Sequence, residues 1–390
     1  MMIPEYVGPC AFGIKMGLVL PGCDLLSLIT ETLKDVDKDG LLTDGDAICI
    51  TESIVARAQN NLVTTEELAR EFQSKLSLPK EGKVGVLFPI TSRNRFALIL
   101  EGISAAVPRG EVIVQLSYPD DEVGNQVIPP EAAERLEQKN GEVITPENFD
   151  EKYVHPVTGV DYTELYKEII AQAGAAPRIY LCNNPKKILE YNIDAVIAAD
   201  IHTRERTKKK IASYMDKVIT LQEVFNNPGS GAWSEWGLLG SNMSSGHKLK
   251  LAPYESNKFV QDLQALIQKE IGKKVEVIIY GDGAYKDPSS GIYELADPCA
   301  AFGATPGVNS ILRTGIKLKY MVDMYYEQGK SEEEIQEILE KESQKERELN
   351  SMESEGTTPR RMEDILASLA DLVSGSADAG TPIVLAKGFL

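Results

Sequence analysis

The stretch Val275-Glu276-Val277-Ile278-Ile279-Tyr280-Gly281-Asp282-Gly283-Ala284-Tyr285-Lys286-Asp287 carries the strongest structural signal in the chain. Its first six residues form an apolar, β-branched run with the length of a buried strand. The run ends in a carboxylate that stands between two glycines. In open α/β sheets, ligands bind beyond the carboxyl ends of the strands. The stretch therefore predicts a buried strand over 275–280 and a candidate site directly after it.

The aspartates of this stretch are candidates for metal binding. Carboxylate oxygens of Asp282 and Asp287 could share a hard divalent cation, Mg²⁺ or Mn²⁺. Gly281 and Gly283 permit positive φ and a close approach of the backbone to a phosphate. The alternative is a tight turn whose aspartates cap backbone amides. The residues themselves leave both interpretations open.

Strand and helix patterns alternate on both sides of this stretch, which indicates an α/β fold. A capping box from Thr64 to Glu67 marks the start of one helix. The section 177–225 has the rhythm of a small α/β unit. The predicted strands are 47–51, 84–88, 111–116, 178–182, 195–199, 217–221, 275–280 and 382–386. The predicted helices are 25–33, 65–76, 96–106, 162–173, 185–191, 204–215, 256–271 and a charge-dense, exposed helix over 331–355.

The loop 240–248 is a candidate site for a nucleotide or another anion. Its side chains include Ser241, Asn242, His247 and Lys248, which supply a hydroxyl, an amide, an imidazole and a cation. The chain contains no GxxxxGK[ST] motif, so this loop is not a P-loop. A surface connection is the alternative, and a lone histidine is more often structural than catalytic.

Two further cationic segments follow predicted strands. Arg57 lies shortly after the strand 47–51 and could reach the same sheet edge, although a solvated arginine is the alternative. The segment 91–95 (Thr-Ser-Arg-Asn-Arg) precedes an apolar helix and resembles an anion site at a helix start. Its alternative is an N-cap with solvated arginines.

Composition narrows the class of protein. The 390 residues carry 41 Lys and Arg against 59 Asp and Glu, a formal net charge of −18, which disfavours nucleic acid as the main partner. No apolar run approaches the ~18 residues of a membrane span, and no basic leader precedes an apolar run at the start. The five cysteines are odd in number and lack a CxxC pair, as in reduced cytosolic proteins. These features predict a cytoplasmic protein that does not act on nucleic acid or membranes, and they do not identify a substrate.

Three separated blocks resemble the coenzyme F420-0:L-glutamate ligase (γ-glutamyl ligase) family. Near the start, Pro21-Gly22-Cys23-Asp24-Leu25 is similar to its P-G-D-D-L, and 44–58 is similar to its G-D-V-L-V-V-T-x-K-I-V-S-K-A. In the centre, Ser241-Asn242, 249–253 and the strand ending at Asp282 parallel its S-N, L-L-P and I-T-D-T elements. At the end, 364–385 resembles D-E-L-A-A-A-A-E-L-V-M-G and the segment after it. Their joint occurrence in the family's order is more specific than any single block.

The resemblance implies a GTP-using ligase that forms an amide bond to L-glutamate on coenzyme F420-0 or a related acceptor, through a phosphorylated intermediate. It also implies a divalent metal, Mg²⁺ or Mn²⁺, with Asp282 among its ligands. The family is typically a homodimer with an intertwined, non-Rossmann mixed sheet.

The chain departs from the family pattern in two ways. Leu239 stands where the family has a second metal-binding aspartate, and Gly283 replaces a threonine. Either Asp120, Asp121 or Asp287 substitutes for the lost ligand, or the chain is a non-catalytic nucleotide- or anion-binding relative. Long additions also divide the core. The predicted segments are core 1–111, an inserted α/β unit 112–236, core 237–307, a charged helical addition 308–356 and core 357–390.

Overall fold

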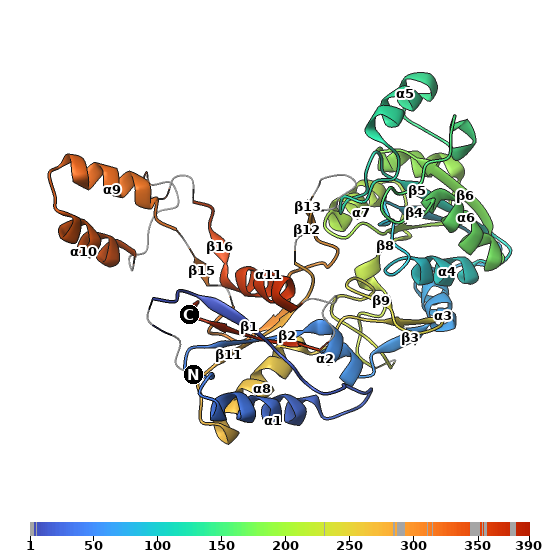
Figure 1. Ribbon diagram of the computed structural model, residues 1–390. Helices are drawn as coiled ribbons and strands as arrows, with labels where there is room; N and C mark the ends of the chain where they lie inside the picture. The colour runs from blue at the N-terminus through green and yellow to red at the C-terminus, as the bar shows by residue number, and fades with distance from the viewer. Residues whose placement is uncertain are drawn as a thin grey trace.

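Two five-stranded β-sheets organise the computed structural model (Figure 1). One sheet is mixed and takes its strands from the two ends and the centre of the chain, and the other is parallel. The predicted α/β fold class is therefore confirmed. The structure describes residues 4, 6–229, 231–283, 285–286, 293–309, 311–313, 315–343, 352, 354, 357–374 and 380–390.

The mixed sheet has the strand order β1-β17-β2-β11-β14. Only β2 and β11 run parallel, with Thr51 opposite Tyr280, and the other neighbours are antiparallel. Because β2 and β11 run in the same direction, their carboxyl ends meet at one edge of the sheet. The strands are β1 (Cys10–Ile14), β17 (Ile383–Lys387), β2 (Ala47–Thr51), β11 (Glu276–Tyr280) and β14 (Ala301–Ala304).

Helices cover both faces of the mixed sheet. Alternate strand residues such as Ile48 and Ile50 point to the face covered by α1 (Leu25–Lys38) and α8 (Ser256–Glu270). Cys49 and its neighbours point to the opposite face, under α11 (Met362–Ser374). This period of two is the geometry of a strand buried on both sides, and it explains why the strand residues are apolar without alternation.

The parallel sheet has the order β6-β5-β4-β7-β8. The chain builds outward from the central strand β4 to one edge and then returns to build toward the other, as in doubly wound folds. Helices α3, α4 and α6 cover one face, and η2 and α7 cover the other. The strands are β4 (Lys83–Leu87), β5 (Glu111–Leu116), β6 (Ala176–Leu181), β7 (Ala195–Ala198) and β8 (Val218–Thr220). The helices are α3 (Thr65–Leu76), α4 (Ala97–Ala106), α6 (Tyr162–Gln172), η2 (Pro185–Tyr191) and α7 (Arg204–Ala212).

This pairing differs from the division of the chain predicted at residue 111. Strand β4 and the start of β5 fall inside the predicted N-terminal core segment, residues 1–111, yet they pair with β6 and β7. The predicted small unit at 177–225 is thus the second half of a larger sheet that begins at residue 83. The non-Rossmann mixed sheet that the family resemblance implies corresponds to the sheet β1-β17-β2-β11-β14, and not to the parallel sheet.

A small three-stranded sheet, β3-β10-β9, lies between the two large ones (Figure 1). Strand β10 (Lys248–Lys250) pairs antiparallel with β3 (Leu62–Thr64) on one side and β9 (Asn242–Met243) on the other. Helix α2 (Glu52–Ala58) connects β2 of the mixed sheet to β3. The small sheet therefore joins the end of β2 to the parallel-sheet unit.

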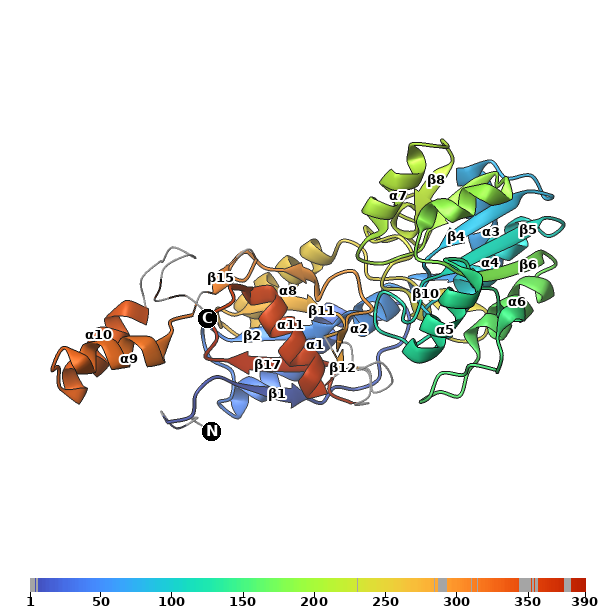
Figure 2. The same cartoon turned by 90° about the horizontal axis from the view of Figure 1, so that it is seen from above.

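The remaining elements lie outside these sheets. Helices α9 (Leu318–Glu327) and α10 (Glu332–Ser343) form an arm that extends away from the rest of the chain in both views (Figures 1 and 2). None of the helices in the described ranges has the length and apolarity needed to cross a bilayer. The other elements are α5 (Pro130–Asn140), η1 (Pro146–Asn148), η3 (Leu221–Glu223), β12 (Tyr285–Lys286), β13 (Tyr293–Glu294), β15 (Leu312–Arg313) and β16 (Arg360–Arg361).

The predicted elements correspond closely to observed ones, but several observed elements were not predicted, among them α2, α9, β1 and β14. The capping box is present, since Thr64 Oγ1 accepts from Glu67 N and Glu67 Oε2 accepts from Thr64 N. Helix α5 was not predicted, because its polar, Glu-rich sequence has only a narrow apolar stripe. The charged helix predicted over 331–355 is confirmed for 332–343, and most of the range beyond it lies outside the described residues.

Candidate functional site: a cationic cleft beside a carboxylate cluster

A cleft with a volume of about 410 Å³ lies between α2 and the small sheet. Arg57, Asn242 and Lys248, three of the residues predicted to bind a nucleotide or substrate, all line it. Asn242 and Lys248 lie close together because β9 pairs with β10, with Asn242 opposite Lys250. Arg57 reaches the same cleft from α2. Ser53, Asn60 and Lys250 also line the cleft.

The cleft is positively charged in a chain whose net charge is −18. Arg57 Nε donates to Val19 O at 2.7 Å, which leaves the terminal nitrogens of its guanidinium without a hydrogen-bond partner among the described residues. Lys248 is exposed and has no ion-pair partner in the described part of the chain. Unpaired cations in a concave surface attract anions. The cleft therefore has the charge and the shape of an anion-binding site.

A buried ion pair supports one wall of the cleft. Lys250 Nζ donates to both carboxylate oxygens of Glu52, at 2.9 and 2.6 Å, and both side chains are buried. Burial raises the pKa of Glu52, and Lys250 opposes that rise. Glu52 is the first residue after β2, so this pair joins the mixed sheet to the small sheet.

A carboxylate cluster lies on the mixed-sheet side of that pair. Asp282 follows β11 as Glu52 follows β2, and the two strands are parallel neighbours. Arg95 Nη1 contacts Asp297 Oδ1 at 2.6 Å, and Arg95 Nη2 forms an ion pair with Asp282 Oδ2. The side chain of Arg95 is only 14% exposed, so the alternative of a solvated arginine is wrong for this residue.

The glycines on either side of Asp282 leave room for two carboxylates to accept hydrogen bonds from backbone amides. Asp282 N donates to Asp297 Oδ2 at 2.8 Å, and Gly283 N donates to Asp371 Oδ2 at 2.6 Å. A Cβ on Gly281 would lie 2.5 Å from Asp297 Oδ2, so a side chain there would displace that carboxylate. The close backbone approach predicted for a phosphate is made here by aspartates.

The described residues do not fit a divalent metal ion at this place. Within the described ranges, no group of three or more His, Cys, Asp or Glu side chains is arranged to hold a metal. Asp282 is engaged by Arg95, and Asp287 lies outside the described residues. Asp121, one of the alternatives for the lost ligand, accepts hydrogen bonds from Thr91 and Asn125 in the parallel-sheet unit.

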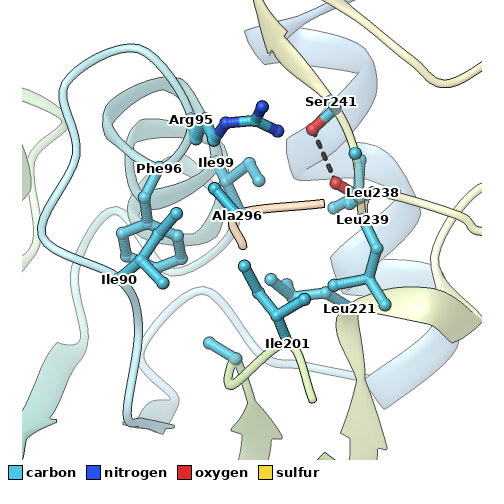
Figure 3. Close-up of a pocket in the computed structure, with 12 residues that line it drawn as sticks. Ile90, Arg95, Phe96, Ile99, Ile201, Leu221, Leu238, Leu239, Ser241 and Ala296 are labelled. Carbon is cyan, nitrogen blue, oxygen red and sulfur yellow. Dashed lines mark hydrogen bonds between the residues drawn. The ribbon is translucent and has the colours of Figure 1, made fainter. Parts of the chain in front are cut away.

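Two of the predicted binding residues in the loop 240–248 lie outside the cleft. Ser241 is buried, and its Oγ donates to Leu238 O at 2.6 Å beside a largely apolar cavity of about 20 Å³ (Figure 3). His247 is exposed, with Nδ1 3.1 Å from Glu101 Oε1. The structure thus brings Arg57, Asn242 and Lys248 together and leaves Ser241 in a structural position.

Comparison with known proteins places this arrangement in a family. The family model described as F420-0:Gamma-glutamyl ligase matches residues 13–388, nearly the whole chain. The chain belongs to the F420-0:gamma-glutamyl ligase family. The resemblance found in the sequence is therefore confirmed, and the chain belongs to a family of ligases. No significant match to a curated protein was found.

Several residues of this ligase-family site were missed by the sequence interpretation. Lys250 is one of three lysines or histidines within four residues, and nothing local distinguishes the one that is buried. Asp297 lies between Ala296 and Pro298, in a short segment with no predicted strand and no motif. Glu52 had a usable signal, because it is a carboxylate that directly follows a predicted strand, 47–51.

We predict that the contribution of Asp282 to the stability of this ligase-family protein falls as pH rises between about 4 and about 7. Burial, followed by the nearby Asp297, raises the pKa of Asp282 to about 7, and the contribution of Arg95 in the opposite direction does not offset them. The unfolded chain then loses this proton near pH 3.8 and the folded chain near 7, so stability present below the lower value is lost through this window. Melting temperatures of the wild type and Asp282→Asn should diverge from pH 4 to 7 and run parallel above it. Parallel curves throughout would contradict the prediction.

Proposed function

We propose that this family member is a nucleotide-dependent ligase that joins an amino acid, L-glutamate, to a small acceptor such as F420-0. The reaction would run through an acyl phosphate. An acceptor carboxylate attacks the terminal phosphorus of GTP and releases GDP. The glutamate amine then attacks the acyl carbon, loses a proton and displaces inorganic phosphate. The single observation that supports this proposal is the positive cleft in an otherwise strongly acidic member of a ligase family.

In this proposal the cleft binds the phosphate groups. Arg57 presents a planar guanidinium that can hold two phosphate oxygens at once, and Lys248 adds a mobile point charge. Asn242 and Ser53 supply neutral hydrogen-bonding groups on opposite walls. The volume of about 410 Å³ lies in the range of small-molecule sites. Because Lys250 is neutralised by Glu52, its role is to support the wall and not to bind the ligand.

The predicted Mg²⁺ or Mn²⁺ on Asp282 and Asp287 is not used in this proposal, since the described residues do not fit it. Phosphate charge is met by the cations of the cleft. We also propose that the protein is a homodimer in the cytoplasm, as the family resemblance implies, and sedimentation at equilibrium would test the dimer.

The proposed reaction can be tested directly. The protein is incubated with GTP, L-glutamate and F420-0, with and without added Mg²⁺ or Mn²⁺. We expect release of GDP and phosphate together with a product heavier by one glutamyl residue, observed by mass spectrometry. ATP in place of GTP tests nucleotide choice, and omission of glutamate tests whether phosphate release depends on the amino acid. Absence of product under all these conditions would refute ligase activity toward this acceptor.

A second candidate is an anion-binding relative without catalysis. The observation that favours it is that Arg95 forms ion pairs with both Asp282 and Asp297. Leu239, at the position of the family's second aspartate, lines the same cavity as Arg95. This candidate predicts that GTP raises the melting temperature while neither GDP nor product forms. The two proposals therefore differ in turnover and not in binding.

A further inference from the structure

Arg95 lies between two aspartates that come from a different region of the chain. It belongs to the loop between β4 and α4 of the parallel-sheet unit, whereas Asp282 and Asp297 follow β11 of the mixed sheet. The loop is held in place independently of the ion pairs. Arg95 N donates to Ser92 Oγ at 3.2 Å, and Asn94 O accepts from Met243 N at 2.7 Å. The guanidinium is therefore delivered to the aspartates by a fixed loop.

Arg95 contacts carboxylate oxygens that accept no hydrogen bond from Asp282 N. Asp297 uses Oδ2 to accept from Asp282 N, and its Oδ1 contacts Arg95 Nη1. Asp282 contacts Arg95 Nη2 through Oδ2. Two carboxylate oxygens thus converge on one cation, and carboxylate oxygens are the ligands that hard divalent ions prefer. The guanidinium of Arg95 occupies the position between these two carboxylates.

On one side of Arg95, the described residues form an apolar cavity wall. The cavity beside the guanidinium is lined mainly by apolar side chains, among them Leu239, Ile201 and Phe96 (Figure 3). Asp297 is 1% exposed, so leaving this carboxylate without a cation would be costly. A permanent counter-charge is therefore required at this position.

We propose that the Arg95 guanidinium is the resident cation of the Asp282–Asp297 pair and excludes divalent ions from it. The pair is a latent divalent-cation site, which becomes available when the guanidinium is removed. The parallel-sheet unit thereby supplies, as a covalently attached charge, the cation that this aspartate pair needs. This inference does not depend on the proposed reaction.

The test measures Mn²⁺ binding to the full-length protein without nucleotide, by loss of the electron paramagnetic resonance signal of free Mn²⁺. The variants are Arg95→Ala and the more conservative Arg95→Gln, with Arg95→Lys as the control that keeps the charge. We expect each neutral variant to bind one more Mn²⁺ than the wild type, roughly tenfold or more tightly than any wild-type site at this pair, because a competing charge at contact distance has been removed. Arg95→Lys should show no gain.

A second substitution locates the new site. Adding Asp297→Asn to Arg95→Gln should abolish the gained Mn²⁺, whereas adding Asp150→Asn, in an exposed pair with Lys139, should leave it unchanged. A folded Arg95→Gln or Arg95→Ala variant without the gained ion would overturn the proposal. So would Mn²⁺ binding by the wild type that Asp282→Asn or Asp297→Asn removes. That last comparison decides the matter even if both neutral Arg95 variants fail to fold.

Discussion

Replacing Lys250 with methionine should lower the free energy of unfolding by about 3–5 kcal/mol, because it leaves the carboxylate of Glu52 buried without its counter-charge. The two side chains are 7% and 9% exposed and contact at 2.6 Å. The pair also stabilises the position of β10, which carries Lys248 into the cleft. Chemical denaturation with urea, followed by far-ultraviolet circular dichroism, would measure the change.

Two further variants separate the buried charge from the loss of a contact. The double variant Glu52→Gln/Lys250→Met should recover much of the lost stability, since no buried charge remains. Lys258→Met is the matched control: its pair with Asp262 is exposed, and removing it should cost less than about 1 kcal/mol. If Lys250→Met changed stability no more than Lys258→Met does, the ion pair would have no structural role.

Removing the unpaired cations of the cleft should weaken triphosphate binding. A charge-assisted hydrogen bond contributes about 1.5–3 kcal/mol, so we expect Lys248→Ala to weaken GTP binding roughly ten- to hundredfold. Arg57→Ala should have an effect of similar size, and the double variant a larger one. Isothermal titration calorimetry with GTP, at two salt concentrations, would measure these affinities. The wild type should lose affinity at higher salt more steeply than the double variant.

The Lys248 variant is the cleaner of the two. The side chain of Lys248 has no hydrogen-bond or ion-pair partner in the described part of the chain, whereas the side chain of Arg57 also donates to Val19 O. Arg57→Lys would keep the charge while removing the bidentate geometry, and Lys139→Ala, on α5, is a control for the loss of one surface charge. Unchanged GTP affinity in Lys248→Ala and in the double variant would show that the anion binds elsewhere.

Most helices, the five strands of the parallel sheet and three strands of the mixed sheet could be predicted from the sequence, because each depends on neighbours in the chain. Residues 275–280 form an apolar run long enough for a strand, and 65–76 carry both a capping box and an apolar stripe, so β11 and α3 appear where they were expected. Helix α5 escaped prediction because its stripe is weak. Strand pairing is different: nothing within 83–116 shows that β4 and β5 pair with β6 and β7 and not with the mixed sheet.

The site shows the same limit. Arg57, Asn242 and Lys248 were each candidates because a cation or amide near a strand end or in a glycine-rich loop can bind an anion. Their residue types were sufficient for that. The partners of Arg95 and Lys250 were not predictable, since Arg95 and Asp297 are 202 residues apart and Lys250 and Glu52 are 198 apart.

Residue types and their order along the chain were enough to predict the α/β class, the ligase family and the side chains that can bind an anion. Folding brings three of those side chains into one cleft and places Arg95 against the aspartates beyond β11, and neither result could be read from local patterns. The difference lies in the distance along the chain over which each property is decided. Helix and strand formation follow from a side chain's nearest neighbours in the chain, whereas the charge state and ligand of a carboxylate depend on what folding places within a few ångströms of it.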